Sequence, residues 1–255
     1  MFDSVADLYD SRRPGYPEPM FDDLVALAGV PSGGELLEVG PGTGQATLPL
    51  VRRGLRVVAL EPGANLAAVL RRKMAGLPVE VVETTLEAWQ PGERRFDVVA
   101  SGTAFHWVDA ETRYASAHGV LRRGGSLAVF WNEHISTADT RPAFDALQDA
   151  YREFAPRPTD EYHLPRPDEI RDRTDEIEES GFFTAVERRR YEWTTTYSTG
   201  EYVGLLATYS PQIAQPEADR RRFLDAIAAT IDTELGGRIV KPYLTDLYVA
   251  RAVER

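Results

Sequence analysis

A glycine-rich segment with an acidic residue in front of it is the strongest chemical signal of this sequence. Residues 38–44 read EVGPGTG and follow a short apolar run. Glycines at such a junction permit a tight turn with positive φ and let a ligand approach the backbone closely. The dinucleotide fingerprint needs a third small residue where Gln45 stands, so the spacing argues against a diphosphate at a helix N-terminus. The carboxylate of Glu38 also suits a cationic ligand better than a diphosphate.

A second acidic residue, Glu61, ends the next apolar run and is followed by Pro62. A carboxylate at this position can accept hydrogen bonds from both ribose hydroxyls of an adenosine. Dinucleotide sites and adenosyl sites share this feature, so Glu61 alone does not distinguish them. Two further segments lie at the ends of apolar runs. Residues 84–89 come just after the third run, and residues 96–107 contain the fourth run with the polar and aromatic residues that end it.

His106 is the candidate for acid–base chemistry. An unperturbed imidazole pKa near 6.5 suits the removal of a proton at neutral pH. A carboxylate substrate needs no base, and His106 would then orient the substrate. A structural histidine bonded to the backbone is the third interpretation.

These residues must be positioned by an alternation of strands and helices. Continuous apolar runs separated by helical patterns predict a parallel sheet covered on both faces, with right-handed crossovers that make it doubly wound. We expect strands at 35–39, 56–60, 79–82, 96–101 and 126–131, and helices at 46–53, 65–75 and 110–121. Beyond them we expect helices at 142–154, 168–180, 201–208 and 217–235, a Pro-rich loop at 155–167, and strands at 186–197 and 245–252.

The domain organisation follows from the same pattern. We expect a single α/β domain over 1–255, with a core at about 34–134, an N-terminal lid at about 1–33 and C-terminal strands with a helical cap at about 135–255. The helices of the last part are short and dispersed, so we expect a cap rather than an independent domain.

Composition excludes several classes of protein. The 255 residues are 43% hydrophobic and 27% charged, which is typical of globular proteins. There is no Cys and there are only 4 His, so we expect no metal site. The net charge of −11 disfavours a nucleic-acid partner. With no run of roughly 20 apolar residues and no leader-like N-terminus, we expect a soluble, cytoplasmic protein without a membrane partner.

The four motifs in this order resemble the class I S-adenosylmethionine-dependent methyltransferases, over about residues 35–131. Residues 104–109, AFHWVD, together with residues 13–17, RPGYP, resemble the trans-aconitate methyltransferase-related subgroup of small-molecule enzymes. The resemblance implies a Rossmann-like, mostly parallel sheet of seven strands whose last strand is antiparallel and inserted between the fifth and sixth. It implies methyl transfer to a small-molecule acceptor, with oxygen of a carboxylate or hydroxyl expected first and nitrogen or carbon open.

The resemblance also implies where the cofactor, S-adenosylmethionine, is held. The glycine turn would face its methionine part, Glu38 would hold its ammonium directly or through water, and Glu61 would accept from its ribose. Thr85 and Leu86 would border adenine, although many relatives have Asp, a stronger acceptor, in place of Thr85. The implied cofactor residues are Tyr9, Arg13, Glu38, Gly40, Pro41, Gly42, Gly44, Glu61, Pro62, Thr85, Leu86, Ser101 and Gly102.

The remaining implied residues lie around the sulfonium and the substrate. Ser101 and Gly102 would offer backbone groups beside the sulfonium, while Tyr9 and Arg13 would close over the cofactor carboxylate or form a plain lid helix. Aromatic rings attract a cation by about 0.5–2 kcal/mol. The expected substrate pocket comprises Tyr16, Phe105, Trp107, Trp131 and His134, of which both tryptophans could instead be core and His134 a solvated loop residue.

Two alternative functions stay open at this point. An NAD(P)-dependent oxidoreductase would also use a glycine turn and Glu61, but Gln45 and the lack of a Tyr-x-x-x-Lys pair disfavour it. A non-catalytic protein that binds an adenosyl ligand would keep the same cofactor residues, because binding and catalysis use different residues.

Overall fold

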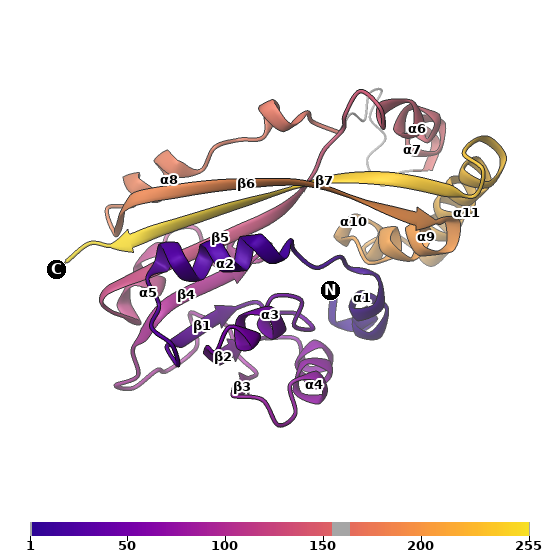
Figure 1. Cartoon of the computed structure of the whole chain (residues 1–255). Helices are drawn as coiled ribbons and strands as arrows, with labels where there is room; N and C mark the ends of the chain where they lie inside the picture. Colours follow the sequence, from indigo (N-terminus) through magenta and orange to yellow (C-terminus); the bar gives the residue numbers. More distant parts are fainter. Residues whose placement is uncertain (1, 155–163, 255) are drawn as a thin grey trace. The chain divides into compact units, whose positions relative to one another are not determined.

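A mixed sheet is the frame of the molecule. The structure is a computed structural model that describes residues 2–154 and 164–254. Within these residues, seven strands form one sheet in the order β3-β2-β1-β4-β5-β7-β6 (Figure 1). The strands are β1 Glu35–Val39, β2 Arg56–Leu60, β3 Val79–Val82, β4 Phe96–Gly102, β5 Leu121–His134, β6 Phe183–Ser198 and β7 Arg238–Ala252. The expected α/β fold with seven strands and an inserted last strand is confirmed.

The first five strands pair in parallel. In the centre of the sheet, Leu37 of β1 lies opposite Val58 of β2 on one side and Val99 of β4 on the other. β7 lies between β5 and β6, and the arrowheads of β6 and β7 point in opposite directions in Figure 1. Parallel pairing requires crossover connections, which the helices between the strands supply.

Helices account for most of the remaining described residues. They are α1 Ala6–Arg12, α2 Glu18–Ala28, α3 Thr47–Arg52, α4 Ala64–Lys73, α5 Arg113–Gly119, α6 Arg141–Ala146, α7 Gln148–Phe154, α8 Thr174–Glu179, α9 Thr199–Ala207, α10 Ser210–Ile213 and α11 Glu217–Glu234. Short 3₁₀ turns lie at Phe2–Val5, Phe105–Trp107 and Pro167–Glu169. Of the expected Pro-rich loop at 155–167, residues 155–163 lie outside the described residues.

The chain divides into two compact units. The first, here called the helical unit, contains Met1–Arg13, Glu133–Ile170 and Glu192–Leu244; the second, the α/β unit, contains Pro14–Asn132, Arg171–Tyr191 and Thr245–Arg255. Each has its own hydrophobic core. Phe223, Ile227 and Ile231 of α11 pack with Leu205 and Tyr243 in the helical unit. Segments far apart in sequence come together in the core of the helical unit.

The sheet of the α/β unit is covered on both faces. Leu36 belongs to a core cluster with Met20 and Phe21 of α2, whereas the next residue, Leu37, belongs to a cluster with Ala117 of α5. Successive side chains of a strand point to opposite faces, so both faces of β1 are buried. This explains why β1 is a continuous apolar run rather than an alternating one.

Three expected elements differ from the structure. β5 begins at Leu121 and runs through Gly124, where a helix end was expected, because pairing of Leu121 with Phe96 overrides the glycine stop signal. The last strand begins at Arg238 instead of residue 245. The acidic helix expected at 168–180 starts only at Thr174, whose N–H donates to the carboxylate of Asp172.

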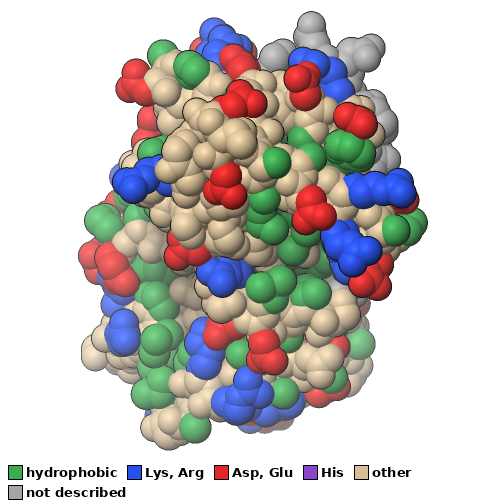
Figure 2. Space-filling view, turned by 90° about the vertical axis from the view of Figure 1, so that its right-hand side faces the viewer, with side chains coloured by type: hydrophobic (Ala, Val, Ile, Leu, Met, Phe, Trp, Pro, Cys, Tyr) green, Lys and Arg blue, Asp and Glu red, His purple; other side chains and the backbone are tan. Residues whose placement is uncertain are grey.

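Charged side chains are interspersed on the face shown in Figure 2, where acidic and basic groups lie among apolar ones. Among the described residues, no helix combines the length and the apolar character needed to cross a bilayer.

Gly40 is the position where the chain most needs glycine. Its φ is +67°, and a Cβ there would lie 2.5 Å from the Cβ of Ala104. We expect Gly40→Ala to lower the free energy of unfolding by about 2–4 kcal/mol, from backbone strain and overpacking together. Urea denaturation followed by circular dichroism measures this.

Gly54→Ala is the matched control, because Gly54 also has positive φ, +83°, but nothing lies within 4 Å of its added Cβ. This variant should lower the free energy of unfolding through backbone strain alone, by about 1 kcal/mol. Equal losses in the two variants would contradict the importance of the close approach at Gly40.

Candidate functional site

The site lies in the α/β unit, where the direction of strand addition reverses. β1 lies between β2 and β4, so the connections that follow β1 and β4 leave toward opposite sides. In open α/β sheets, ligands bind in the crevice outside the carboxyl ends of the strands at this switch point. The glycine turn follows β1, Glu61 follows β2 and Gly102 ends β4. The fold therefore brings three of the predicted motifs together.

The backbone of the turn has the predicted conformation. Gly40, Gly42 and Gly44 have φ of +67°, +60° and +92°. A Cβ at Gly44 would lie 2.7 Å from Leu70 of α4, so this glycine allows the turn to pack closely against α4. Pro41 lies between the first two glycines, and its carbonyl accepts the N–H of Gly44 at 3.0 Å.

Glu61 is anchored by the backbone on both sides of its carboxylate. Oε2 accepts the N–H of Gly42 and Oε1 accepts the N–H of Gly63, both at 2.9 Å, and the residue is 5% exposed. These two hydrogen bonds hold the carboxylate in one orientation at the glycine turn. Pro62 separates Glu61 from Gly63.

Glu38 is the second buried carboxylate, at the C-terminal part of β1. Its Oε2 accepts the hydroxyl of Thr47, the first residue of α3, at 2.7 Å. Burial raises the pKa of Glu38 to about 7, the Thr47 hydrogen bond lowers it, and the negative charge of Glu61 raises it again. A cation bound beside Glu38 would favour its ionised form.

Hydrogen bonds of Ser101 and Thr103 hold the end of β4 in place. Thr103 is not among the site residues that the sequence predicted. Ser101 donates its hydroxyl to the carbonyl of Val39 at 2.8 Å. Thr103 has φ of +53°, which is uncommon for a β-branched residue. Its Oγ1 lies 3.0 Å from the hydroxyl of Tyr16 and accepts the N–H of Asn132 at 3.3 Å. Sequence reasoning missed Thr103 because the residue type gives no signal for a positive φ.

Gly102 sits between these groups. A Cβ there would lie 2.5 Å from the ring of Phe130 and 2.8 Å from the Tyr16 hydroxyl. Tyr16, expected in the substrate pocket, packs edge-to-face on Phe130 with 4.8 Å between ring centroids. Only glycine leaves room for Tyr16 at the end of β4.

The segment after β3 carries the residues expected at adenine. Leu86 is buried with Val39 and Leu60, residues of the strands that hold the two carboxylates. The hydroxyl of Thr85 accepts the N–H of Ala88 at 3.3 Å, so it is used within its own turn.

His106 and Trp131 meet in the α/β unit. The indole N–H of Trp131 donates to Nδ1 of His106 at 3.4 Å, and Trp131 is buried. The two predicted pocket residues beside His106 differ in exposure. Phe105 is buried, whereas Trp107 is 63% exposed. The pKa of His106 is lowered by burial and then by the positive charges of Arg173 and Arg113, so the ring is neutral at pH 7.

Arg173 and Arg113 are site residues that the sequence did not reveal. The guanidinium of Arg173 lies over the ring of Trp131, 4.2 Å from its centroid. Arg113 forms an ion pair with Glu176 at 2.5 Å. The local sequence around these two arginines gives no signal for a site. Arg173 lies 42 residues after Trp131 in the sequence (173 minus 131), so only the fold brings the two together.

Three predicted residues, Tyr9, Arg13 and His134, belong to the helical unit. Arg13 donates through Nε and Nη2 to the hydroxyl and carbonyl of Thr208, at 2.9 and 2.8 Å, and lies 5.0 Å from the ring centroid of Tyr9. His134 Nε2 lies 3.2 Å from the hydroxyl of Tyr209. Their expected roles at the cofactor and the substrate stay predictions.

Known proteins were compared with the chain and its fold. Residues 37–129 match the family described as a methyltransferase domain. An uncharacterized methyltransferase of Mycobacterium tuberculosis is 32% identical over 234 residues, covering 91% of this chain and 86% of the relative. The chain belongs to the methyltransferase family. The resemblance to the trans-aconitate-related subgroup stays a prediction.

Solved structures agree with this methyltransferase in fold. A candidate type II methyltransferase from Anaeromyxobacter dehalogenans has a TM-score of 0.64 at 23% identity, over 94% of this chain and 97% of that one. A phosphoethanolamine N-methyltransferase of Haemonchus contortus, in complex with S-adenosylhomocysteine, has a TM-score of 0.56 at 13% identity, over 99% of this chain and 58% of that one. These likenesses show the class I methyltransferase fold. The methyltransferase relative, rather than the fold, decides against the nicotinamide-dependent alternative.

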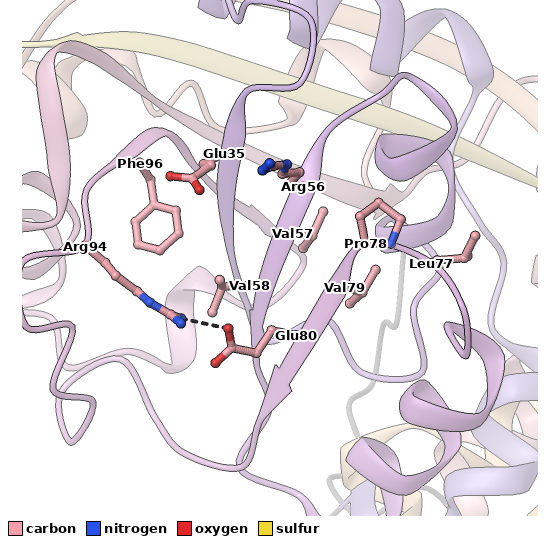
Figure 3. A pocket seen from close by; sticks show the side chains of 10 residues that line it. All are labelled: Glu35, Arg56, Val57, Val58, Leu77, Pro78, Val79, Glu80, Arg94 and Phe96. Carbon is pink, nitrogen blue, oxygen red and sulfur yellow. Dashed lines mark hydrogen bonds and ion pairs between the residues drawn. The ribbon is translucent and has the colours of Figure 1, made fainter.

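A surface hollow of the methyltransferase lies away from the predicted site. Its volume is about 410 Å³, and the first residues of four strands, Glu35, Arg56, Val79 and Phe96, line it (Figure 3). Arg94 and Glu80 form an ion pair at its edge, 2.8 Å apart. Because the glycine turn follows the opposite end of β1, this hollow is not the predicted cofactor site. Within residues 2–154 and 164–254, no group of three His, Asp or Glu side chains is placed to hold a metal.

Lys241 of β7 is a buried cation that sequence reasoning did not single out. It is 2% exposed, and burial followed by the charge of Arg13 lowers its pKa to about 7. The unfolded chain therefore binds one more proton than the folded chain between pH 7 and about 10, and the cost of burying the cation is largest below pH 7.

We expect Lys241→Met to raise the free energy of unfolding of the ligand-free protein by about 1–4 kcal/mol at pH 6. The gain should shrink as the pH rises from 7 toward 10, because the native lysine becomes neutral there. Urea denaturation at several pH values tests this, with Lys73→Met on the exposed surface of α4 as the control. A Lys241→Met variant less stable than the native protein at pH 6 would contradict the expectation.

Proposed function

We propose that this methyltransferase transfers a methyl group from S-adenosylmethionine to a small-molecule acceptor. The observation that supports it best is the pair of buried carboxylates, Glu38 and Glu61, at the glycine turn. Among the described residues, the only charge that acts on the pKa of Glu38 is that of Glu61. Such a site favours a cationic ligand with ribose hydroxyls and disfavours a diphosphate.

The residues of the turn fit the parts of this cofactor. Glu61 would accept the ribose hydroxyls, and Glu38 would hold the ammonium. Leu86 and Thr85 would border adenine, and the backbone of Ser101 and Gly102 would lie beside the sulfur. When bound, S-adenosylmethionine supplies an electrophilic methyl group on a sulfonium.

We assign His106 to orienting the acceptor rather than to removing its proton. Since Nδ1 accepts the indole N–H of Trp131, the neutral ring carries its proton on Nε2. In this tautomer Nε2 donates a hydrogen bond. An acceptor that is already ionised, such as a carboxylate, needs no base and would be held by this donor and by the nearby charges of Arg173 and Arg113.

The acceptor is therefore proposed to be a small molecule methylated on oxygen, with a carboxylate favoured over a hydroxyl. The subgroup resemblance of residues 13–17 and 104–109 points the same way. We place the enzyme in the cytoplasm, with no nucleic-acid or membrane partner.

Glu61→Ala should weaken the binding of S-adenosylhomocysteine and of 5′-methylthioadenosine by at least about 100-fold each. Both ligands carry the ribose, and two hydrogen bonds to a charged acceptor contribute about 1.5–3 kcal/mol each. Isothermal titration calorimetry measures the affinities, and circular dichroism checks that the turn still folds without its backbone anchor. Glu80→Ala, which removes an exposed carboxylate of β3, is the matched control. Unchanged affinities for Glu61→Ala would remove this residue from its role.

The pH dependence of binding tests Glu38 separately. Its raised pKa means that the free carboxyl is protonated below pH 7 and must ionise to hold an ammonium. The affinity for S-adenosylhomocysteine should rise by up to about tenfold per pH unit below 7 and level off above it. The rise should be absent in Glu38→Gln.

5′-Methylthioadenosine lacks the ammonium and serves as the ligand control, with an affinity that stays flat from pH 5.5 to 8. If the two ligands show the same pH dependence, Glu38 does not hold the ammonium.

A further inference from the structure

We propose that the helical unit contains a binding site for a small organic carboxylate, distinct from the cofactor, in which Lys241 and Arg13 hold the carboxylate and His134 lies between aromatic walls. The inference goes beyond the proposed methyl transfer and does not depend on it. All the residues named for this site belong to the helical unit.

Lys241 is the centre of the site because no described residue supplies a counter-charge to its ammonium. Among the described residues it forms no hydrogen bond and no ion pair. Its Nζ lies over two aromatic rings, 5.4 Å from the centroid of Phe144 and 5.3 Å from that of Tyr243. Ring faces attract a cation, but they replace only part of the hydration that a buried ammonium loses.

Aromatic rings connect Lys241 to two further basic side chains. His134 packs edge-on against Tyr243, with 5.6 Å between centroids, and stacks on Tyr209 at 5.1 Å. On the same Tyr209, the guanidinium of Arg13 lies 4.6 Å from the ring centroid. Three basic side chains, from the residue that follows α1, from β5 and from β7, thus share two tyrosine rings.

The charges within this cluster repel one another. Burial, Lys241 and Arg13 lower the pKa of His134 well below its usual value, so His134 is neutral at pH 7. The charge that acts on Lys241 is that of Arg13, and no carboxylate of the described residues contributes to either shift. A buried cluster with two potential cations, and with no anion among the residues that the structure describes, is stabilised by an anionic ligand.

The surroundings favour a carboxylate on an apolar body over a phosphate. Apolar ring surface surrounds the basic groups. It is provided by Phe144, Tyr209 and Tyr243, and by Trp193, which stacks on Tyr243 with 4.7 Å between the ring centroids. A phosphate dianion loses more hydration in such surroundings than a carboxylate with one charge. Arg13 keeps its hydrogen bonds to Thr208 through Nε and Nη2, which fixes the plane of its guanidinium.

The sequence provides a direct probe of this site. Its only lysines are Lys241 and Lys73, and Lys73 is exposed on α4 of the other unit. Protein labelled with ¹³C at lysine Cε therefore gives two side-chain NMR signals, one from the proposed site and one internal control. Lys241→Met and Lys73→Met assign them.

The labelled protein is titrated with acetate, phenylacetate, phenylacetamide and inorganic phosphate, each without and with saturating S-adenosylhomocysteine. We expect phenylacetate to shift the Lys241 signal and leave Lys73 unmoved, with weaker binding of acetate. Phenylacetamide, which has the same body without the charge, should bind at least tenfold more weakly. Lys241→Met should weaken phenylacetate binding at least tenfold and change the affinity for S-adenosylhomocysteine less than twofold, whereas Lys241→Arg should retain both.

Three results would overturn the proposal. The first is a Lys241 signal that none of the carboxylates moves. The second is a response to phosphate that exceeds the response to phenylacetate. The third is a Lys241 signal that S-adenosylhomocysteine alone shifts to saturation, or a loss of its affinity in Lys241→Met, since the carboxylate held there would then be that of the cofactor. The calorimetry of Glu61→Ala tests the proposed function without involving Lys241, so the two failures are distinguishable.

Discussion

Charge held out of water is the constraint on which both units of this protein depend. In the α/β unit, Glu61 is buried with each carboxylate oxygen bonded to a backbone N–H, and Glu38 is buried with the hydroxyl of Thr47. In the helical unit, Lys241 is buried over aromatic rings. Burial is the largest cause that raises the pKa of Glu38 and lowers that of Lys241, each to about 7. In each unit, a ligand of the opposite charge would stabilise the ionised form of the buried group.

The carboxylates stay in place because the backbone around them is rigid. The positive φ of Gly40 and Gly42 directs the turn across the end of β1, and Gly40 touches Ala104 so closely that no side chain fits. After β4, Thr103 has a strained backbone conformation with positive φ, which its hydrogen bonds with Tyr16 and Asn132 stabilise. Strain of this kind persists only where the surrounding structure over-determines it.

Local signals were sufficient for the strands and turns near the cofactor site. The runs at 35–39, 56–60 and 79–82 became β1, β2 and β3 with the expected bounds, because each is short, apolar and ended by turn residues. The same signals failed at two places beyond β4. Gly124 did not end a helix, and the last strand is longer than its apolar part, since pairing with neighbouring strands outweighs local preference there.

The sequence by itself determined the class of fold, the place of the glycine turn and the two acidic residues beside it. These features depend on backbone conformation and on the order of short segments, and the local sequence determines both. Only the tertiary structure decided that Arg173 lies on Trp131 and that Lys241, Arg13 and His134 share two tyrosine rings. Long-range packing makes these contacts between side chains up to 196 residues apart (209 minus 13), and the types of the single residues give no signal for them.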